Sequence, residues 1–289
     1  MLIKRQLWII TIIFIILFFV ILSICIRYYN VTAIYHGPPS NANDSNAQKI
    51  MQLNDAGVLV MPRLVSNDDI QTITKYINNN DIHKAKQYIM HSNIIKSQIT
   101  QILGADYEFH DYIFLIKKSQ FHTCHRDYNG DFFNEGQQFP SYTIIIYLEN
   151  MQKCLDVIPT SHKSKNEYDY NLTDYTQTVM CGAGDAILFN ANLIHNGSLN
   201  ENKNKNSMRI QMKISHKNDR DVLRFYNNYH KMLNVENNTP HVFKQIQKHL
   251  SCQFPVVSSY LKQYDNNKNN NINTNSGIFS NLFAKLDNV

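Results

Sequence analysis

Residues 208–215 read Met-Arg-Ile-Gln-Met-Lys-Ile-Ser, so apolar Met and Ile residues alternate with Arg209, Gln211 and Lys213. Because successive side chains of a β-strand point to opposite faces, this alternation predicts a strand with one apolar and one polar face. The polar face either meets solvent or lines the interior of a barrel whose apolar face is covered by helices. The pattern alone leaves both arrangements open.

Other segments on either side repeat this strand-like character. They are rich in β-branched and aromatic residues, and turn sequences such as Asn129-Gly130-Asp131 and Gly182-Ala183-Gly184-Asp185 separate them. The segments are residues 58–61, 112–116, 142–148 and 186–189. Many spaced strands without long intervening helices predict an all-β core, arranged as a sandwich or a barrel.

Helical patterns flank this core. Ser66-Asn67-Asp68-Asp69 has the residue types that begin a helix, and Ile70, Ile73 and Ile77 follow at helical spacing. Beyond residue 217 two apolar patterns predict two further helices: Leu223, Phe225, Tyr226 and Tyr229 for the first, and Val242, Ile246 and Leu250 for the second.

Composition bounds the class of protein. The chain has 289 residues, a net charge of +5 and 43% hydrophobic residues, which is enough apolar material for a packed core. Seven Pro and nine Gly exclude collagen-like and Pro-rich classes, and five Cys exclude a disulfide-dense secreted scaffold. The small positive charge is dispersed, so no nucleic-acid partner is expected.

The amino-terminal region contains an uncharged apolar run over residues 7–26, LWIITIIFIILFFVILSICI. Its length matches the roughly 20 residues that cross the hydrocarbon core of a bilayer. A cleaved signal peptide is the alternative, but its apolar region is about 7–15 residues and ends in small residues, whereas this run ends at Ile26-Arg27. Lys4 and Arg5 precede it, which favours a cytosolic tip. We therefore expect a single-pass type II membrane protein, with the lipid bilayer as partner and a luminal or external body.

The amino-acid composition indicates the type of genome that encodes the chain. Asn, Ile, Lys and Tyr are used heavily, which is typical of AT-rich genomes, including those of large DNA viruses. A viral protein in a host membrane fits this bias.

His125-Arg126-Asp127 is the first candidate site. If this segment is a strand, side chains two residues apart point to the same face, and an imidazole and a carboxylate converge. They supply two thirds of the facial triad that holds non-haem Fe(II). By itself, a His-x-Asp triplet is more often a surface turn, so the assignment depends on residues elsewhere in the chain.

His195 is the candidate third ligand. Gly184-Asp185 begins an apolar strand that leads to His195, although a lone His in this position is more often only a strand-end residue. Arg209 lies 14 residues further on. A guanidinium binds a planar carboxylate through two parallel hydrogen bonds, so Arg209 suits a dicarboxylate co-substrate.

The order of His-x-Asp, distal His and Arg resembles that of Fe(II)/2-oxoglutarate oxygenases, and the chain resembles the phytanoyl-CoA dioxygenase family over residues 50–216. Residues 54–70 are similar to that family's opening strand and helix, and residues 147–163 to its central strand and Pro-Gly-Ser-His turn. This chain has Thr160 where the family usually has Gly, and Arg126 where Gln is common. These differences affect the turn and the pocket but remove no ligand. We expect a structural role for His162 and packing for Cys124.

The resemblance implies a double-stranded β-helix, or jelly roll, with flanking α-helices, preceded here by one transmembrane helix. It implies that His125, Asp127 and His195 are the catalytic metal ligands, and that Arg209 binds 2-oxoglutarate, with O2 as co-substrate. The implied reaction is hydroxylation of an unidentified small molecule, lipid or protein side chain, with decarboxylation of 2-oxoglutarate to succinate. Asp127 favours hydroxylation over halogenation, because related halogenases lack that carboxylate.

The expected organisation follows from these patterns. The segments are residues 1–29 as tip and anchor, 30–46 as linker, 47–216 as the oxygenase domain, 217–262 as C-terminal helices, 263–276 as a disordered Asn-rich segment and 277–289 as a short amphipathic helix.

Three other classes make different predictions. A catalytically inactive barrel, acting as a membrane-anchored binding or structural module, would not bring His125, Asp127 and His195 together or would retain no metal. A nucleic-acid demethylase of the same superfamily would carry a basic groove beside the iron. A hydrolase is disfavoured, because the sequence has no Gly-x-Ser-x-Gly and adjacent Cys124 and His125 would point to opposite faces of a strand.

Overall fold

The computed structural model describes residues 2–30, 34–35, 46–118, 123–127, 136–163, 176–199, 208–234 and 240–253. The predicted Asn-rich segment 263–276 and the predicted helix 277–289 lie outside these residues, as does most of the predicted linker 30–46.

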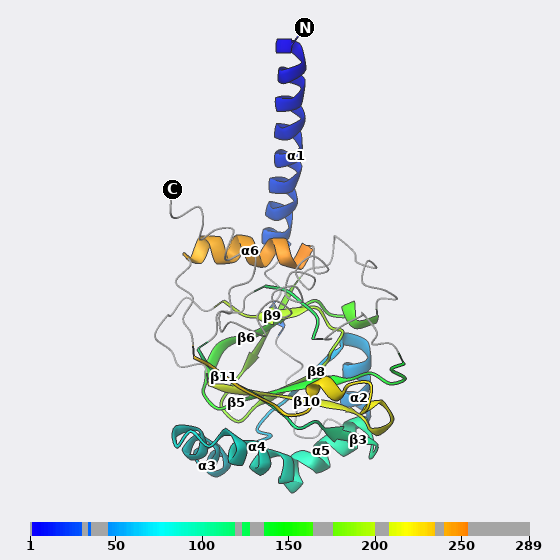
Figure 1. Ribbon diagram of the computed structural model, residues 1–289, viewed down its shortest axis with the longest axis vertical. Helices are drawn as coiled ribbons and strands as arrows, with labels where there is room; N and C mark the ends of the chain where they lie inside the picture. Colours follow the sequence, from blue (N-terminus) through cyan, green and yellow to red (C-terminus); the bar gives the residue numbers. More distant parts are fainter. Residues whose placement is uncertain are drawn as a thin grey trace.

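Two β-sheets face each other and form the core of the fold (Figure 1). The larger, seven-stranded sheet has the order β11-β4-β10-β5-β8-β2, with β3 paired to β10, and the smaller, four-stranded sheet has the order β1-β7-β6-β9. The strands of the larger sheet are β2 (Val58–Met61), β3 (Tyr107–Phe109), β4 (Tyr112–Lys118), β5 (Tyr142–Tyr147), β8 (Ala186–Asn190), β10 (Arg209–His216) and β11 (Tyr229–Asn234). Those of the smaller sheet are β1 (Ile34–Tyr35), β6 (Met151–Val157), β7 (Gln177–Cys181) and β9 (His195–Gly197). This is a double-stranded β-helix, as the family resemblance implied, within a mixed α/β fold.

Helices cover the outer face of the larger sheet. In Figure 1, α3 (Asn67–Asn78), α4 (Ile82–His91) and α5 (Asn93–Leu103) lie along one side of it. The helix predicted after Ser66 is confirmed as α3, and Ser66 and Asp69 form a capping box at its start. One helix, α2 (Asn46–Ala56), precedes β2.

Strand β10 shows where each face of the alternating pattern lies. Its Ile and Met side chains join the core beneath the helices, where Ile210, Met212 and Ile214 are each 0% exposed. Arg209 and Lys213 on the opposite face are also buried, at 6% and 3% exposed. The polar face therefore lines the barrel interior, which resolves the two arrangements that the sequence left open.

A tight turn sets the start of β8, the strand that leads to His195. Gly184 has φ +86°, and a Cβ there would approach the Val65 carbonyl oxygen to 2.5 Å. Only glycine satisfies both constraints. The Asp185 carboxylate closes the turn by accepting hydrogen bonds from the backbone N–H groups of Gly182 (2.7 Å) and Arg63 (2.8 Å).

The segment after residue 217 differs from the prediction of two helices. Its first half contains the short 3₁₀ turns η2 (Lys217–Asp219) and η3 (Arg224–Tyr226) and then strand β11, which pairs in parallel with β4. The Tyr229 ring stacks on Tyr112 at 4.6 Å between centroids, so an apolar set that resembled a helix face packs against an open sheet edge instead. The second predicted helix is confirmed as α6 (His241–Gln253).

Helix α6 is joined covalently to the barrel. Cys252 near its end forms a disulfide with Cys124, which precedes the first candidate metal ligand. The expectation that Cys124 only packs is therefore wrong. Ser251 reinforces the junction, because its hydroxyl accepts a hydrogen bond from the Cys124 backbone N–H at 2.8 Å.

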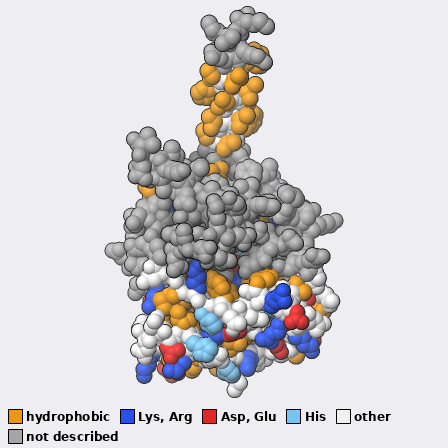
Figure 2. Space-filling view, viewed as in Figure 1, with side chains coloured by type: hydrophobic (Ala, Val, Ile, Leu, Met, Phe, Trp, Pro, Cys, Tyr) orange, Lys and Arg blue, Asp and Glu red, His pale blue; other side chains and the backbone are white. Residues whose placement is uncertain are grey.

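The amino-terminal helix α1 (Leu2–Asn30) extends away from the body (Figures 1 and 2). Its large apolar side chains between Trp8 and Leu22 are exposed, with Trp8 at 70% and Phe14 at 68%. Judged on the part of the chain that the structure describes, no helix is long and apolar enough to pass through a membrane. The predicted transmembrane helix is thus not found there.

Candidate metal centre

Residues 123–127 carry His125 and Asp127; this extended segment, called here the ligand strand, is held to β9 by backbone pairing. His125 and His195 form an isolated antiparallel bridge, in which each backbone N–H donates to the other's carbonyl at 2.9 Å. The Asp127 N–H donates to the Ala191 carbonyl at 2.7 Å. Since the chain passes from β8 in the larger sheet to β9 in the smaller one, His195 arrives opposite a segment about 70 residues earlier in the sequence.

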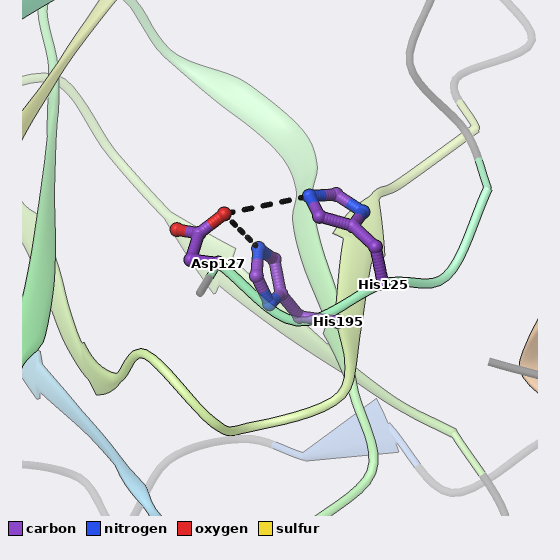
Figure 3. Close-up of side chains that lie close together, drawn as sticks. All are labelled: His125, Asp127 and His195. Carbon is purple, nitrogen blue, oxygen red and sulfur yellow. Dashed lines mark ion pairs between the residues drawn. The ribbon is translucent and has the colours of Figure 1, made fainter. Parts of the chain in front are cut away.

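The three predicted ligands converge on one point (Figure 3). Asp127 Oδ1 lies 3.5 Å from His125 Nε2 and 3.6 Å from His195 Nε2. Two ligand atoms that each lie roughly 2.1 Å from a metal, at right angles to each other, are about 3 Å apart. The observed separations need only a small contraction to enclose an ion.

Backbone carbonyls orient both imidazoles. His125 Nδ1 donates to the Thr123 carbonyl and His195 Nδ1 to the Leu193 carbonyl, each at 2.9 Å. Because a carbonyl only accepts, the proton of each neutral ring stays on Nδ1 and the lone pair on Nε2 faces the centre. Burial lowers the pKa of His195 to about 3, so this ring stays neutral and able to bind a metal.

Asp127 stays ionised despite its burial. Burial raises its pKa, but Lys213, His195 and His125 oppose this effect and hold the pKa well below its usual value. The Tyr226 hydroxyl donates to the Asp127 backbone carbonyl at 2.6 Å and helps to fix the residue's position. Two neutral imidazoles and one carboxylate form a donor set suited to Fe(II).

Arg209 lies in the same barrel but outside the triad. It stands opposite Tyr147 of β5 and two positions from Gln211, whose side-chain amide reaches Asp127 at 3.2 Å. Two positions on a strand correspond to about 7 Å, comparable with the span of a five-carbon dicarboxylate. The Tyr147 hydroxyl is buried and makes no hydrogen bond within the described part of the chain. A buried orphan donor beside a buried guanidinium fits an anionic ligand.

Several residues near the site were not predicted from the sequence. Thr143, Tyr147 and Lys213 point into the barrel because they share its inward register on β5 and β10. The period-2 pattern of 208–215 marked Lys213 as a neighbour of Arg209 in register, but nothing in the sequence marked Thr143.

Arg126, between the first two ligands, points away from the triad. Its guanidinium donates to the Ser161 carbonyl at 3.0 Å and also to the Asn192 carbonyl. It thereby holds the 159–162 turn and the β8–β9 connection against the ligand strand. His162 lies outside the triad and its Nε2 donates to the Asn54 carbonyl at 3.1 Å, in keeping with the structural role expected for it.

These features define a class of protein: a double-stranded β-helix with a two-histidine, one-carboxylate metal centre inside the barrel. Residues 82–207 match the family model for phytanoyl-CoA dioxygenase (PhyH). Over these residues the chain is similar to that family, and it is an Fe(II)/2-oxoglutarate-dependent oxygenase.

Solved structures share the fold at low sequence identity. The chain resembles SnoN, a non-haem α-ketoglutarate-dependent epimerase from nogalamycin biosynthesis, with a TM-score of 0.50 and 11% identity over 59% of this chain and 83% of SnoN. It also resembles SnoK, a carbocyclase of the same biosynthesis (TM-score 0.49, 14% identity, 65% of this chain and 94% of SnoK). HygX from Streptomyces hygroscopicus matches with a TM-score of 0.46 and 12% identity over 58% of this chain and 85% of HygX. No protein of curated function matches the chain.

Proposed function

We propose that this protein hydroxylates an unidentified primary substrate and converts 2-oxoglutarate and O2 into succinate and carbon dioxide. His125, Asp127 and His195 hold Fe(II), and Arg209 binds the far carboxylate of 2-oxoglutarate. The observation that carries the proposal is the convergence of the three ligand atoms inside one barrel that also buries Arg209. The substrate class is a small molecule, a lipid or a protein side chain.

The chain's own residues orient the reactants and exclude water. When bound, iron and 2-oxoglutarate supply the oxidising chemistry that activates O2 and attacks a substrate C–H bond. The triad would hold the ion with three protein ligands and leave its other positions for the co-substrates. Arg209 and the Tyr147 hydroxyl hold the far carboxylate, which fixes how far the keto acid extends toward the triad. The β5 and β8 side chains Ile145, Ile187 and Phe189 give this part of the barrel an apolar wall.

The outcome at the substrate carbon is the finer part of the proposal. The Asp127 carboxylate fills the position that a halide needs, which supports hydroxylation over halogenation. SnoN is described as an epimerase and SnoK as a carbocyclase, so product analysis must separate hydroxylation from these outcomes.

We also propose that residues 7–26 anchor the protein in a bilayer, as a single-pass type II protein with a luminal or external body. The exposed apolar side chains between Trp8 and Leu22 support the anchor. The Cys124–Cys252 disulfide supports the orientation, because disulfides persist in oxidising compartments. Protease protection in sealed microsomes tests this: a protected body is expected, and digestion of the intact barrel would refute it.

The competing function is a catalytically inactive barrel that acts as a binding or structural module. Anaerobic addition of Fe(II) and 2-oxoglutarate to the full-length protein in detergent separates the two. The oxygenase predicts a visible charge-transfer band from the chelated keto acid. His125→Ala should abolish the band, and Arg209→Ala should weaken the apparent 2-oxoglutarate affinity far more than metal binding.

The matched control is Lys86→Met, which removes a buried cation of α4 that pairs with Asp111 and contacts His230, away from the triad. This variant should keep the band and the wild-type 2-oxoglutarate affinity. No band in folded wild-type protein would favour the inactive module. A normal affinity in Arg209→Ala would place the co-substrate anchor elsewhere.

A further inference from the structure

The two oxygens of the Asp127 carboxylate have different surroundings. Oδ1 faces both imidazoles at 3.5 and 3.6 Å. Oδ2 accepts three hydrogen bonds, from Lys213 Nζ at 2.7 Å, Thr143 Oγ1 at 2.8 Å and Gln211 Nε2 at 3.2 Å. An oxygen with its lone pairs occupied in this way is a poor metal ligand. The surroundings therefore allow one oxygen of Asp127, and not the other, to bind an ion.

Lys213 is the charged member of these three donors. Its side chain is 4% exposed, and its ammonium lies over the Tyr226 and Tyr112 rings at 5.2 and 5.8 Å from their centroids. Within the described residues, Asp127 is its one ion-pair partner. A buried ammonium beside a site for a divalent cation repels that cation and weakens its binding. The position of Lys213 is therefore explained only if the ammonium has another role.

This role of the Lys213 ammonium belongs to the metal-free protein. Without an ion, Asp127 would be a carboxylate buried beside two imidazoles, which is strongly unfavourable unless a positive charge pairs with it. Lys213 provides that charge by donating to Oδ2. Oδ1 is left pointing at the two histidines (Figure 3).

We propose that Lys213 is a positioning residue of the metal centre: its ammonium is the permanent counter-ion that keeps Asp127 in place as a one-oxygen ligand before the metal arrives. The proposal rests on the metal-binding function proposed above. By keeping Oδ2 away from the ion, Lys213 also leaves the positions opposite the triad open for co-substrates.

The proposal predicts that Lys213→Met changes metal-free stability and metal affinity in opposite directions. Loss of the ammonium destabilises the metal-free protein, because Asp127 loses its partner. It also removes the repulsion of the metal, so Co(II) should bind more tightly, by roughly ten-fold or more. Binding should then raise the melting temperature of Lys213→Met by more than it raises that of wild type.

The experiment measures Co(II) affinity and the melting temperature with and without Co(II), on the full-length protein in detergent. Lys213→Arg, which keeps the charge, should behave like wild type. Thr143→Val removes a neutral donor to the same oxygen, so it should weaken Co(II) binding and not tighten it. Lys86→Met is the control for loss of a buried lysine, and should lower the melting temperature equally with and without Co(II).

Each outcome separates this inference from the function it rests on. If wild type does not bind Co(II), the proposed metal site itself fails. If wild type binds Co(II) but Lys213→Met shows the wild-type affinity and metal-induced shift, the metal site stands and the role of Lys213 is refuted. If Lys213→Met instead loses 2-oxoglutarate affinity with metal binding unchanged, Lys213 is a co-substrate ligand and the proposal is wrong.

Discussion

The disulfide between the ligand strand and α6 makes a quantitative prediction. Cys124 and Cys252 are 128 residues apart in sequence, so the bond closes a long loop in the unfolded chain. The loop-entropy relation gives about 5 kcal/mol of stabilisation for a loop of this length, at the upper end of the range of roughly 2–5 kcal/mol seen when native disulfides are removed. Cys252→Ala should lower the free energy of unfolding by an amount in this range.

Urea unfolding followed by far-ultraviolet circular dichroism provides the assay. The single Trp of the chain, Trp8, lies on α1 and does not report on the barrel. Reductant should lower the free energy of unfolding of wild type by the same amount as the Cys252→Ala substitution does. Cys252→Ala itself should be insensitive to reductant. Because Cys124 precedes His125, we also expect weaker metal binding in Cys252→Ala.

A matched variant controls for the loss of a buried thiol. Cys154 is buried and free, so Cys154→Ala should keep the full response to reductant. Equal unfolding midpoints of wild type with and without reductant would refute the reasoning, because they would mean that the closed loop contributes no stability.

Two further predictions concern the turn and a buried histidine. Thr160 has φ +66°, a left-handed conformation that costs a residue with a Cβ roughly 1–2 kcal/mol, so Thr160→Gly should raise the free energy of unfolding by about 0.5–1 kcal/mol after the extra entropy of glycine in the unfolded chain is subtracted. Thr160→Ala keeps the Cβ, and an equal gain in that control would contradict the explanation. Burial lowers the pKa of His110 to about 4, so its stabilising contribution is complete above pH 6.5 and is lost as the pH falls from 6.5 toward 4, by about 1.4 kcal/mol per pH unit. Unfolding measured across that range should show a shallower pH dependence for His110→Gln, and an unchanged slope would mean that His110 does not carry it.

The three residues that we propose as metal ligands could be selected from local patterns. His125 and Asp127 are two residues apart, and a strand brings side chains at that spacing to one face whatever the rest of the fold does. His195 follows a glycine turn and an apolar strand, and those features depend only on neighbouring residues. The resemblance to a known family then connected the two segments.

The prediction failed where the same local pattern suits two environments. Tyr226 and Tyr229 have the spacing of a helix face, yet Tyr229 belongs to β11 and stacks on Tyr112 at the edge of the larger sheet. An unpaired strand edge readily forms backbone hydrogen bonds with an extended segment. No local sequence pattern shows that such an edge is available.

The amino-acid sequence by itself determined the alternation of the strands, the residue types of the metal centre and the position of α6, because these follow from side-chain periodicity and chemistry over short distances. Only the tertiary structure decided that the polar face of β10 lines the barrel, that Lys213 and Thr143 converge on Asp127, and that Cys124 pairs with Cys252. The contacts of Lys213 with Asp127 and Thr143, and the disulfide, join residues 70 or more positions apart at a separation of a few ångströms. These contacts depend on which faces and edges of the two sheets come to lie against each other when the sheets pack.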